Sequence, residues 1–182
     1  MERSEEELVE TLVTGDIAAF EVILTRYEKA IWNHLRRLTG STEDATDLTQ
    51  ETFIKLYQKR HLVDPAGNFK NWLYRVATNT AYDAMRKKHH IIEVPIDNSD
   101  ESPETIPPEL AYSITEEKIL SHDIEQALSK ITPHYRNILL LYYREGFGYE
   151  ELSVLLEIPL NTVKTHLRRA KQSLREHLQN YG

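Results

Sequence analysis

Apolar residues recur every three or four positions along most of the chain, which is the spacing of amphipathic α-helices. Ser4 and Glu7 have the spacing of a capping box and predict a short helix that ends near Gly15. Asp16 is placed to cap a second, long amphipathic helix, which Gly40 ends. The chain is therefore expected to begin with two consecutive helices.

A third and a fourth helix follow before the pattern changes. Ser41 and Thr42 open the third helix, which fades before Asp64, and the apolar spacing resumes over residues 69–88 for the fourth. Residues 1–90 together predict a first helical domain.

The segment 91–115 breaks the helical pattern. It holds four of the seven prolines of the chain and six acidic residues with no basic one. Such a composition cannot readily bury a core. This segment is therefore expected to be a flexible acidic linker between two domains.

Helical spacing returns in residues 116–182, the predicted second domain. One helix is expected over residues 116–130, and Pro133 stands where the first position of the next helix would lie. A short helix over 149–156 and a last one over 160–179 complete the pattern. The predicted fold class is all-α, with two small helical domains joined by the flexible, acidic, proline-containing linker.

The net charge of −7 by itself argues against a nucleic-acid partner, because affinity for phosphate depends on Lys and Arg. The charge is unevenly distributed, however. Residues 164–175 contain five basic residues and no acidic one, and residues 86–88 are all basic. The total therefore conceals one basic face in each predicted domain.

Composition and spacing argue against several other classes of protein. The absence of cysteine excludes disulfides and thiolate chemistry, and no stretch approaches the roughly 20 apolar residues of a membrane span. Residues 1–10 are acidic, unlike a signal peptide, so a cytoplasmic protein is expected. No histidine pair has the helical spacing of a zinc site, and no glycine-rich phosphate loop occurs. Neither catalysis, a cofactor nor a metal is expected.

The strongest functional signal is a helix-turn-helix pattern in residues 149–171. Such a motif packs the apolar side of its second helix against the first, and here Leu152, Val163 and Leu167 fall at packing positions beside the small Ser153. The outward positions of the second helix offer donors suited to base edges and phosphates. In this sequence they are Asn161, Thr162, Lys164, Thr165, Arg168, Arg169 and Lys171.

Periodicity alone would also fit a solvated helical hairpin, and the one-sided positive charge favours DNA. The turn of the motif carries Glu157, where the backbone tends to need a positive φ and glycine is frequent. A non-glycine residue there costs roughly 1 kcal/mol, which weakens the signal without excluding the motif.

A second signal, in residues 68–88, consists of aromatic residues interleaved with cations. Stacking on such rings is worth about 1 to 3 kcal/mol per unpaired base. The rings belong to Phe69, Trp72, Tyr74 and Tyr82, and the cations to Lys70, Arg75, Arg86, Lys87 and Lys88. An ordinary buried helix face also explains Trp72, Val76 and Met85, so both interpretations stay open.

A third signal lies in the predicted third helix, where Asp47, Gln50 and Glu51 stand within one turn. They could meet a protein partner, and a generic solvated surface explains them equally well. Taken in their order along the chain, the three motifs resemble the extracytoplasmic-function (group IV) sigma factors of bacterial RNA polymerase over nearly the whole chain. Residues 44–55 look like the family's polymerase-binding helix. Residues 69–88 are similar to its promoter-melting segment, and residues 158–170 resemble its minus-35 reading helix.

The resemblance implies a factor that binds core RNA polymerase and promoter DNA. The residues implied in polymerase binding are Asp47, Leu48, Gln50, Glu51 and Phe53. Those implied at the minus-10 element are Trp72, Arg75, Asn79, Arg86, Lys87 and Lys88. The outward residues of the last helix are then implied to read the minus-35 element, and an anti-sigma factor, membrane-anchored in many relatives, is a further expected partner.

Two other classes of function stay open on the sequence. One is a helix-turn-helix transcriptional regulator that binds an operator without polymerase. The other is a pure interaction protein, which would leave the basic last helix without a role.

Overall fold

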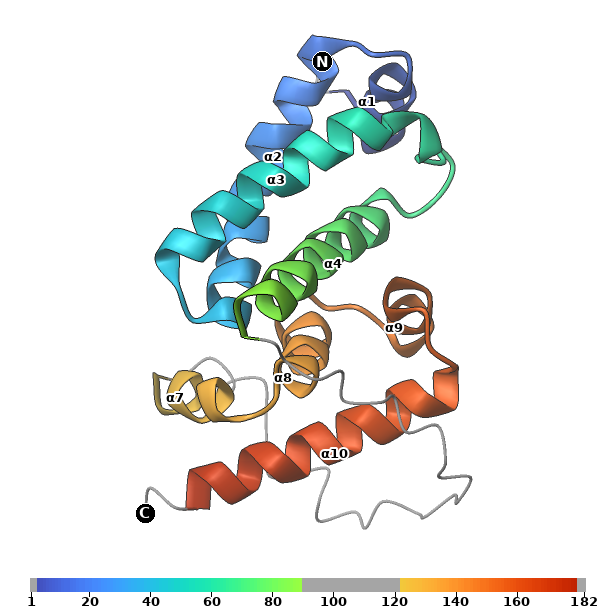
Figure 1. Cartoon of the computed structure of the whole chain (residues 1–182). Coiled ribbons are helices and arrows are strands. Elements are labelled where there is room, and N and C mark those ends of the chain that lie inside the picture. The colour runs from blue at the N-terminus through green and yellow to red at the C-terminus, as the bar shows by residue number, and fades with distance from the viewer. Residues whose placement is uncertain (1–2, 90–121, 180–182) are drawn as a thin grey trace. The chain divides into compact units, whose positions relative to one another are not determined.

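The computed structural model describes residues 3–89 and 122–179, in which every regular element is a helix (Figure 1). The chain divides into two compact units, Met1–His90 and Ile91–Gly182. The predicted all-α class with two helical domains is confirmed. The predicted linker, residues 91–115, lies outside the described residues. Among the helices of the two described ranges, none is long and apolar enough to cross a membrane.

The first unit contains, within its described residues, the helices α1, α2, α3 and α4 and the 3-10 turn η1, which precedes α4 (Figure 1). Helix α1 spans Glu5–Val13, α2 spans Ile17–Thr39 and α3 spans Thr42–Lys59. The turn η1 spans Arg60–Leu62, and α4 spans Phe69–His89. Helix α2 packs against α1 and α3, and α4 packs against both α2 and α3. Leu35, Leu56 and Leu73 are fully buried where these helices meet, so the unit has its own apolar core.

The residues that begin and end the first two helices are those predicted from the sequence. The Ser4 hydroxyl accepts a hydrogen bond from the Glu7 amide, and the Glu7 carboxylate accepts one from the Ser4 amide. The Asp16 carboxylate accepts a hydrogen bond from the Ala18 amide at 2.9 Å and starts α2. Gly40 ends α2 in the left-handed conformation, with φ 76°. These local signals fix the bounds of α1 and α2.

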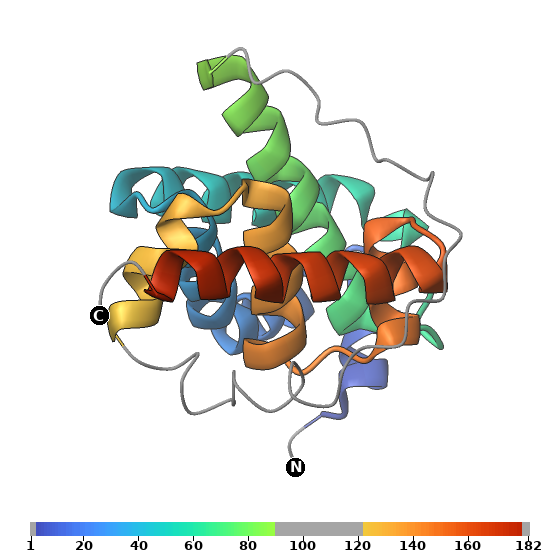
Figure 2. The same ribbon diagram turned by 90° about the horizontal axis from the view of Figure 1, so that it is seen from below.

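The second unit contains, within its described residues, the helices α7, α8, α9 and α10 and the π-helical turn η2, which follows α8. Helix α7 spans His122–Lys130 and α8 spans Pro133–Leu139, and the turn η2 spans Leu140–Arg144. Helix α9 spans Tyr149–Leu156, and α10 spans Leu160–Gln179. Helix α10, red in Figure 2, packs against α7, α8 and α9. The bounds of α9 and α10 are those predicted. The predicted start of the helix before them, near residue 116, lies outside the described residues.

A buried arginine joins α7 to α8. Arg136 is 7% exposed, and its guanidinium donates hydrogen bonds to the carbonyl oxygens of Leu128, Ser129 and Ile131 at 2.7, 2.8 and 3.1 Å. The last carbonyls of a helix have no partner within it, so these bonds satisfy the end of α7. They hold α7 on the helix that supports α10.

Candidate functional site

The turn between α9 and α10 is closed by hydrogen bonds between Ser153 and Ile158. The Ser153 hydroxyl donates to the Ile158 carbonyl oxygen at 2.6 Å, and the Ile158 amide donates to the Ser153 carbonyl oxygen at 3.1 Å. Glu157 has φ 56° and ψ 41°, the left-handed conformation expected for this turn. The sequence had suggested only a small side chain at Ser153, and its hydroxyl contributes a bond as well.

The two helices of the motif pack through the predicted apolar positions. The predicted residues Leu152, Val163 and Leu167 are all buried, and so is Leu155. At the start of α9, the Gly148 amide donates a hydrogen bond to the Glu151 carboxylate at 2.8 Å. The geometry is that of a helix-turn-helix.

The predicted DNA-reading residues of α10 remain at the surface of the unit. Asn161 and Lys164 are exposed. The half-exposed members of the set are Thr162, Thr165, Arg168, Arg169 and Lys171. The Lys171 ammonium lies over the ring of Tyr143, 5.3 Å from its centroid, so this cation already has an aromatic neighbour within the unit. The remaining basic side chains give α10 one positively charged side.

One polar residue of α10 points inward. His166 is 5% exposed, and its Nδ1 lies 2.8 Å from Nε2 of His134 on α8. The two rings meet edge to face, with centroids 4.7 Å apart and an interplanar angle of 87°. The two histidines lie on different helices, so no spacing within one helix predicts their contact. Among the described residues, no group of three or more His, Cys, Asp or Glu side chains could hold a metal ion.

Burial controls the charge of this histidine pair. The pKa of His134 is lowered to about 4. The larger cause is the loss of water around the ring on burial, and the smaller is electrostatic repulsion by the neighbouring His166. Burial also lowers the pKa of His166, and the charge of Arg169 lowers it further. Both rings are therefore neutral at neutral pH, and one ring nitrogen donates its hydrogen to the other.

In the first unit, three of the residues implied at the minus-10 element share one side of α4. Trp72, Arg75 and Asn79 are spaced three and four positions apart, and each reaches the surface, Asn79 most fully. Two of the rings expected to stack on bases do not reach the surface, which corrects that expectation. Phe69 is 2% exposed and Tyr74 1% exposed, because both pack into the core.

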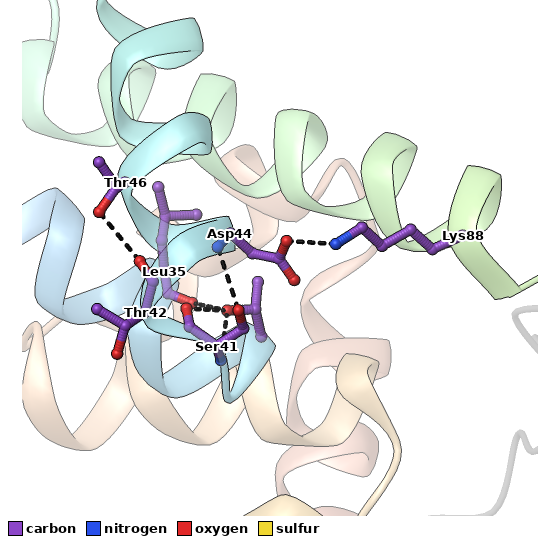
Figure 3. A network of polar contacts seen from close by, with 7 residues as sticks. Leu35, Ser41, Thr42, Asp44, Thr46 and Lys88 are labelled. Carbon is purple, nitrogen blue, oxygen red and sulfur yellow. Dashed lines mark hydrogen bonds and ion pairs between the residues drawn. The ribbon is translucent and has the colours of Figure 1, made fainter.

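The basic residues at the end of α4 are exposed and partly paired. Lys88 is bonded to the carboxylate of Asp44 in the first turn of α3, where Ser41 caps the helix (Figure 3). This bond raises the pKa of Lys88. Arg86 pairs with the carboxylate of Asp83 one turn before it on α4. Two cations of the predicted DNA-contacting cluster are thus matched by carboxylates of the same unit.

The side of α3 that faces solvent carries three of the five residues implied in polymerase binding. Asp47, Gln50 and Glu51 are exposed there. Leu48 and Phe53, 4% and 3% exposed, instead belong to the core of the unit. A further residue of this side, Ile54, is 55% exposed and was not among the predicted contacts. Its spacing from Gln50 and Glu51 is the sequence signal that could have found it.

Comparison with known proteins agrees with this geometry. The Sigma-70 region 2 family matches residues 23–91, and the Sigma-70, region 4 family matches residues 121–174. The chain belongs to the sigma-70 family of RNA polymerase sigma factors. The predicted family is thereby confirmed.

Similar proteins narrow the group within the family. The ECF RNA polymerase sigma factor SigE of Mycolicibacterium smegmatis is 33% identical over 174 residues, which are 93% of this chain and 66% of SigE. The ECF RNA polymerase sigma factor SigW of Bacillus subtilis is 28% identical over 190 residues, covering 99% of this chain and 100% of SigW. The chain is a sigma factor of the extracytoplasmic-function group.

Two solved structures share the fold. CnrH, in complex with the cytosolic domain of CnrY, has a TM-score of 0.72 and 18% identity, and the match covers 98% of this chain and 99% of CnrH. The sigma factor RpoE from Bartonella quintana, in complex with the anti-sigma factor NepR, has a TM-score of 0.66 and 24% identity. That match covers 90% of this chain and 98% of RpoE.

Proposed function

We propose that this sigma factor binds core RNA polymerase through α3, the minus-10 element through α4 and the minus-35 element through α10. The observation that carries the proposal is the helix-turn-helix of α9 and α10, whose outward positions include the basic residues Lys164, Arg168 and Arg169. The chain supplies binding and positioning in the cytoplasm, and polymerase supplies the chemistry.

The proposed polymerase contact is the α3 face, defined as Asp47, Gln50, Glu51 and Ile54. These residues fall at i, i+3, i+4 and i+7 and so lie on one side of the helix. An exposed isoleucine beside three polar side chains has the mixed composition of a protein interface, which combines apolar and polar contacts. Leu48 and Phe53 contribute from beneath, because their packing fixes the position of α3.

At the minus-10 element, Trp72, Arg75 and Asn79 offer a ring, a cation and an amide on one side of α4. A ring beside donors can stack on an unpaired base and hydrogen-bond its edge. Phe69 and Tyr74 support this side of α4 from the core, and Trp72 provides the stacking surface.

The cations at the end of α4 are proposed to hold the DNA backbone. Arg86, Lys87 and Lys88 are exposed, and phosphate contacts fix the position of a protein on DNA without reading its sequence. Phosphate replaces Asp83 and Asp44 as the partner of Arg86 and Lys88 when DNA binds.

At the minus-35 element, α10 is proposed to enter the major groove with its N-terminal half. Asn161, Lys164, Thr165 and Arg168 provide donors and acceptors along its outward side, and Arg169 extends this set. The end of the helix nearest the turn carries these residues, as in other helix-turn-helix proteins.

An anti-sigma factor is the proposed inhibitory partner. CnrH and RpoE were each solved with a second protein, and the protein bound to RpoE is the anti-sigma factor NepR. By analogy, a protein that covers the α3 face of this chain would keep it from polymerase.

The test is run-off transcription with purified core polymerase on a library of DNA with randomised minus-10 and minus-35 positions. Transcripts that appear only when the sigma factor is added, and that share sequence at both positions, are the expected result. If the chain binds DNA sequence-specifically and the addition of core polymerase changes nothing, the protein is a polymerase-independent regulator. If the chain does not bind core polymerase at all, the proposal is refuted.

A further inference from the structure

The contact between His134 and His166 links the DNA-reading helix to the helix beneath it. His134 lies in the first turn of α8, directly after Pro133 at the start of that helix. His166 lies on the inward side of α10, between the outward Thr165 and the surface residues Arg168 and Arg169. Their ring nitrogens are 2.8 Å apart, within hydrogen-bond distance.

The inward side of α10 also carries apolar residues. Val163, Leu167, Ala170 and Leu174 are buried along it. Apolar packing keeps this side of the helix buried, but it is less sensitive to small rotations about the helix axis than a directional contact is. A hydrogen bond between two rings fixed edge to face is directional. The histidine pair therefore adds a directional contact that restricts small rotations of α10 about its axis.

The groups around the pair keep it neutral and bonded. The ring of Tyr135 on α8 lies 6.1 Å from each histidine ring, centroid to centroid, and Arg169 on α10 adds a positive charge beside His166. Burial and this charge both disfavour an imidazolium. The hydrogen bond therefore persists across the neutral pH range.

We propose that His134 is a positioning residue for minus-35 recognition. Through His166, it sets the rotation of α10 about its axis and hence the angle at which Thr165, Arg168 and Arg169 meet the DNA. Recognition of base edges tolerates little angular error, because hydrogen bonds weaken steeply when misaligned. The inference rests on the proposed minus-35 function of α10 and adds a residue outside the DNA-facing surface.

The experiment compares promoter binding by full-length variants bound to core polymerase. For each variant, the measured quantity is the ratio of affinities for a promoter chosen from the library and for the same promoter with its minus-35 positions permuted. His134→Ala should reduce this ratio about tenfold, the size of one lost base-pair discrimination. His134→Gln should restore most of it, since a glutamine amide nitrogen can replace Nε2 as a donor. His177→Ala, in the last turn of α10, is the matched control and should leave the ratio unchanged.

A second readout separates positioning from simple loss of stability. In His134→Ala, His166 gains water and loses its neighbour, so its pKa should rise toward the ordinary value, which NMR titration of the ring can follow. The discrimination ratio of this variant should then vary with pH near neutrality, while that of the wild type stays constant. His166→Asn, which keeps a nitrogen near the Nδ1 position, should retain more discrimination than His166→Ala.

The outcomes distinguish this inference from the function on which it rests. If the wild type fails to discriminate the two promoters, the minus-35 function itself is refuted. If the wild type discriminates and His134→Ala does so equally, the positioning role is refuted. A loss of affinity for both promoters by the same factor, with no recovery in His134→Gln, would overturn it too, because it would indicate only destabilisation.

Discussion

The hydroxyl oxygen of Ser153 lies 2.6 Å from the carbonyl oxygen of Ile158, and this hydrogen bond spans the turn between α9 and α10. The bond ties the last turn of α9 to Ile158, two residues before the first residue of α10. The angle between the helices therefore depends on a side chain as well as on apolar packing.

Replacement of Ser153 by alanine should destabilise the second unit by about 1 to 2 kcal/mol, the typical cost of leaving a buried acceptor without its donor. Alanine keeps the residue small, so close approach of the helices is unaffected and the loss reports the hydroxyl alone. Denaturant unfolding followed by signals of the second unit measures it. Ser173→Ala, on α10, is the control and should cost less. Equal costs would show that the bond adds nothing.

Replacement of Glu157 by glycine should stabilise the turn by about 0.5 to 1 kcal/mol. The residue has φ 56°, and a left-handed conformation costs a residue with a side chain roughly 1 to 2 kcal/mol, partly offset by the greater freedom of glycine in the unfolded chain. Thermal unfolding measures the gain. Glu157→Ala keeps the strain and should show no such gain. A similar rise in both variants would point to removal of the charge.

Local structure was predictable because its causes are local. Asp16 and Gly40 set the bounds of α2 through contacts within a few residues, and the sequence around them is sufficient to recognise them. The left-handed turn at Glu157 was likewise predicted from its place in the motif, although the residue is not glycine.

Which side of each motif reaches solvent was harder to predict. Leu48 and Phe53 occur within the polymerase-binding motif, and Tyr74 within the melting segment, but all three are buried. A family motif combines residues that bind with residues that hold the binding side chains, and only packing separates them. The contact of His134 with His166 depends on how α8 crosses α10, which no spacing within one helix encodes.

The stability of the second unit should fall as the pH decreases from about 6.5 to 4. Burial lowers the folded-state pKa of His134 to about 4, while an unfolded histidine titrates near about 6.5. The unfolded chain therefore takes up a proton first, and the stability present above pH 6.5 is lost as the pH falls. The full difference corresponds to about 3 kcal/mol.

Denaturant unfolding of the second unit at a series of pH values checks this dependence. His134→Gln has no titrating ring at this position, so its stability should vary less over the same range. His166 retains a lowered pKa and keeps part of the dependence in that variant. Parallel curves for the two proteins would contradict the assignment to His134.

Replacement of Asp44 by asparagine should increase the affinity of the free chain for promoter DNA. The carboxylate is bonded to Lys88, and its removal releases one cation for a phosphate (Figure 3). Each additional phosphate contact steepens the dependence of log affinity on log salt concentration by about 0.9. Fluorescence anisotropy at several salt concentrations would measure a gain of about two- to fivefold at low salt.

The control for this variant is Glu43→Gln, which changes the net charge and the charge in the first turn of α3 in the same way. Its effect should be smaller, because Lys88 remains bonded to Asp44. An equal gain in both variants would mean that overall charge, and not the bond, limits DNA binding.

The α3 face makes the clearest prediction for polymerase binding. Ile54, the apolar member of this face, is 55% exposed, and placing a charge there would bury an unpaired carboxylate in the complex. Ile54→Asp should therefore weaken binding to core polymerase by at least about tenfold, or about 1.4 kcal/mol, as expected for an apolar residue that the interface buries. Because the side chain is exposed in the free chain, the variant should fold normally, which circular dichroism can verify.

The matched control is Ile17→Asp, an apolar-to-acidic change outside the α3 face, at a position 62% exposed at the start of α2. This variant should leave the affinity for core polymerase unchanged. If both variants bind core polymerase as the wild type does, the contact lies on another side of the unit.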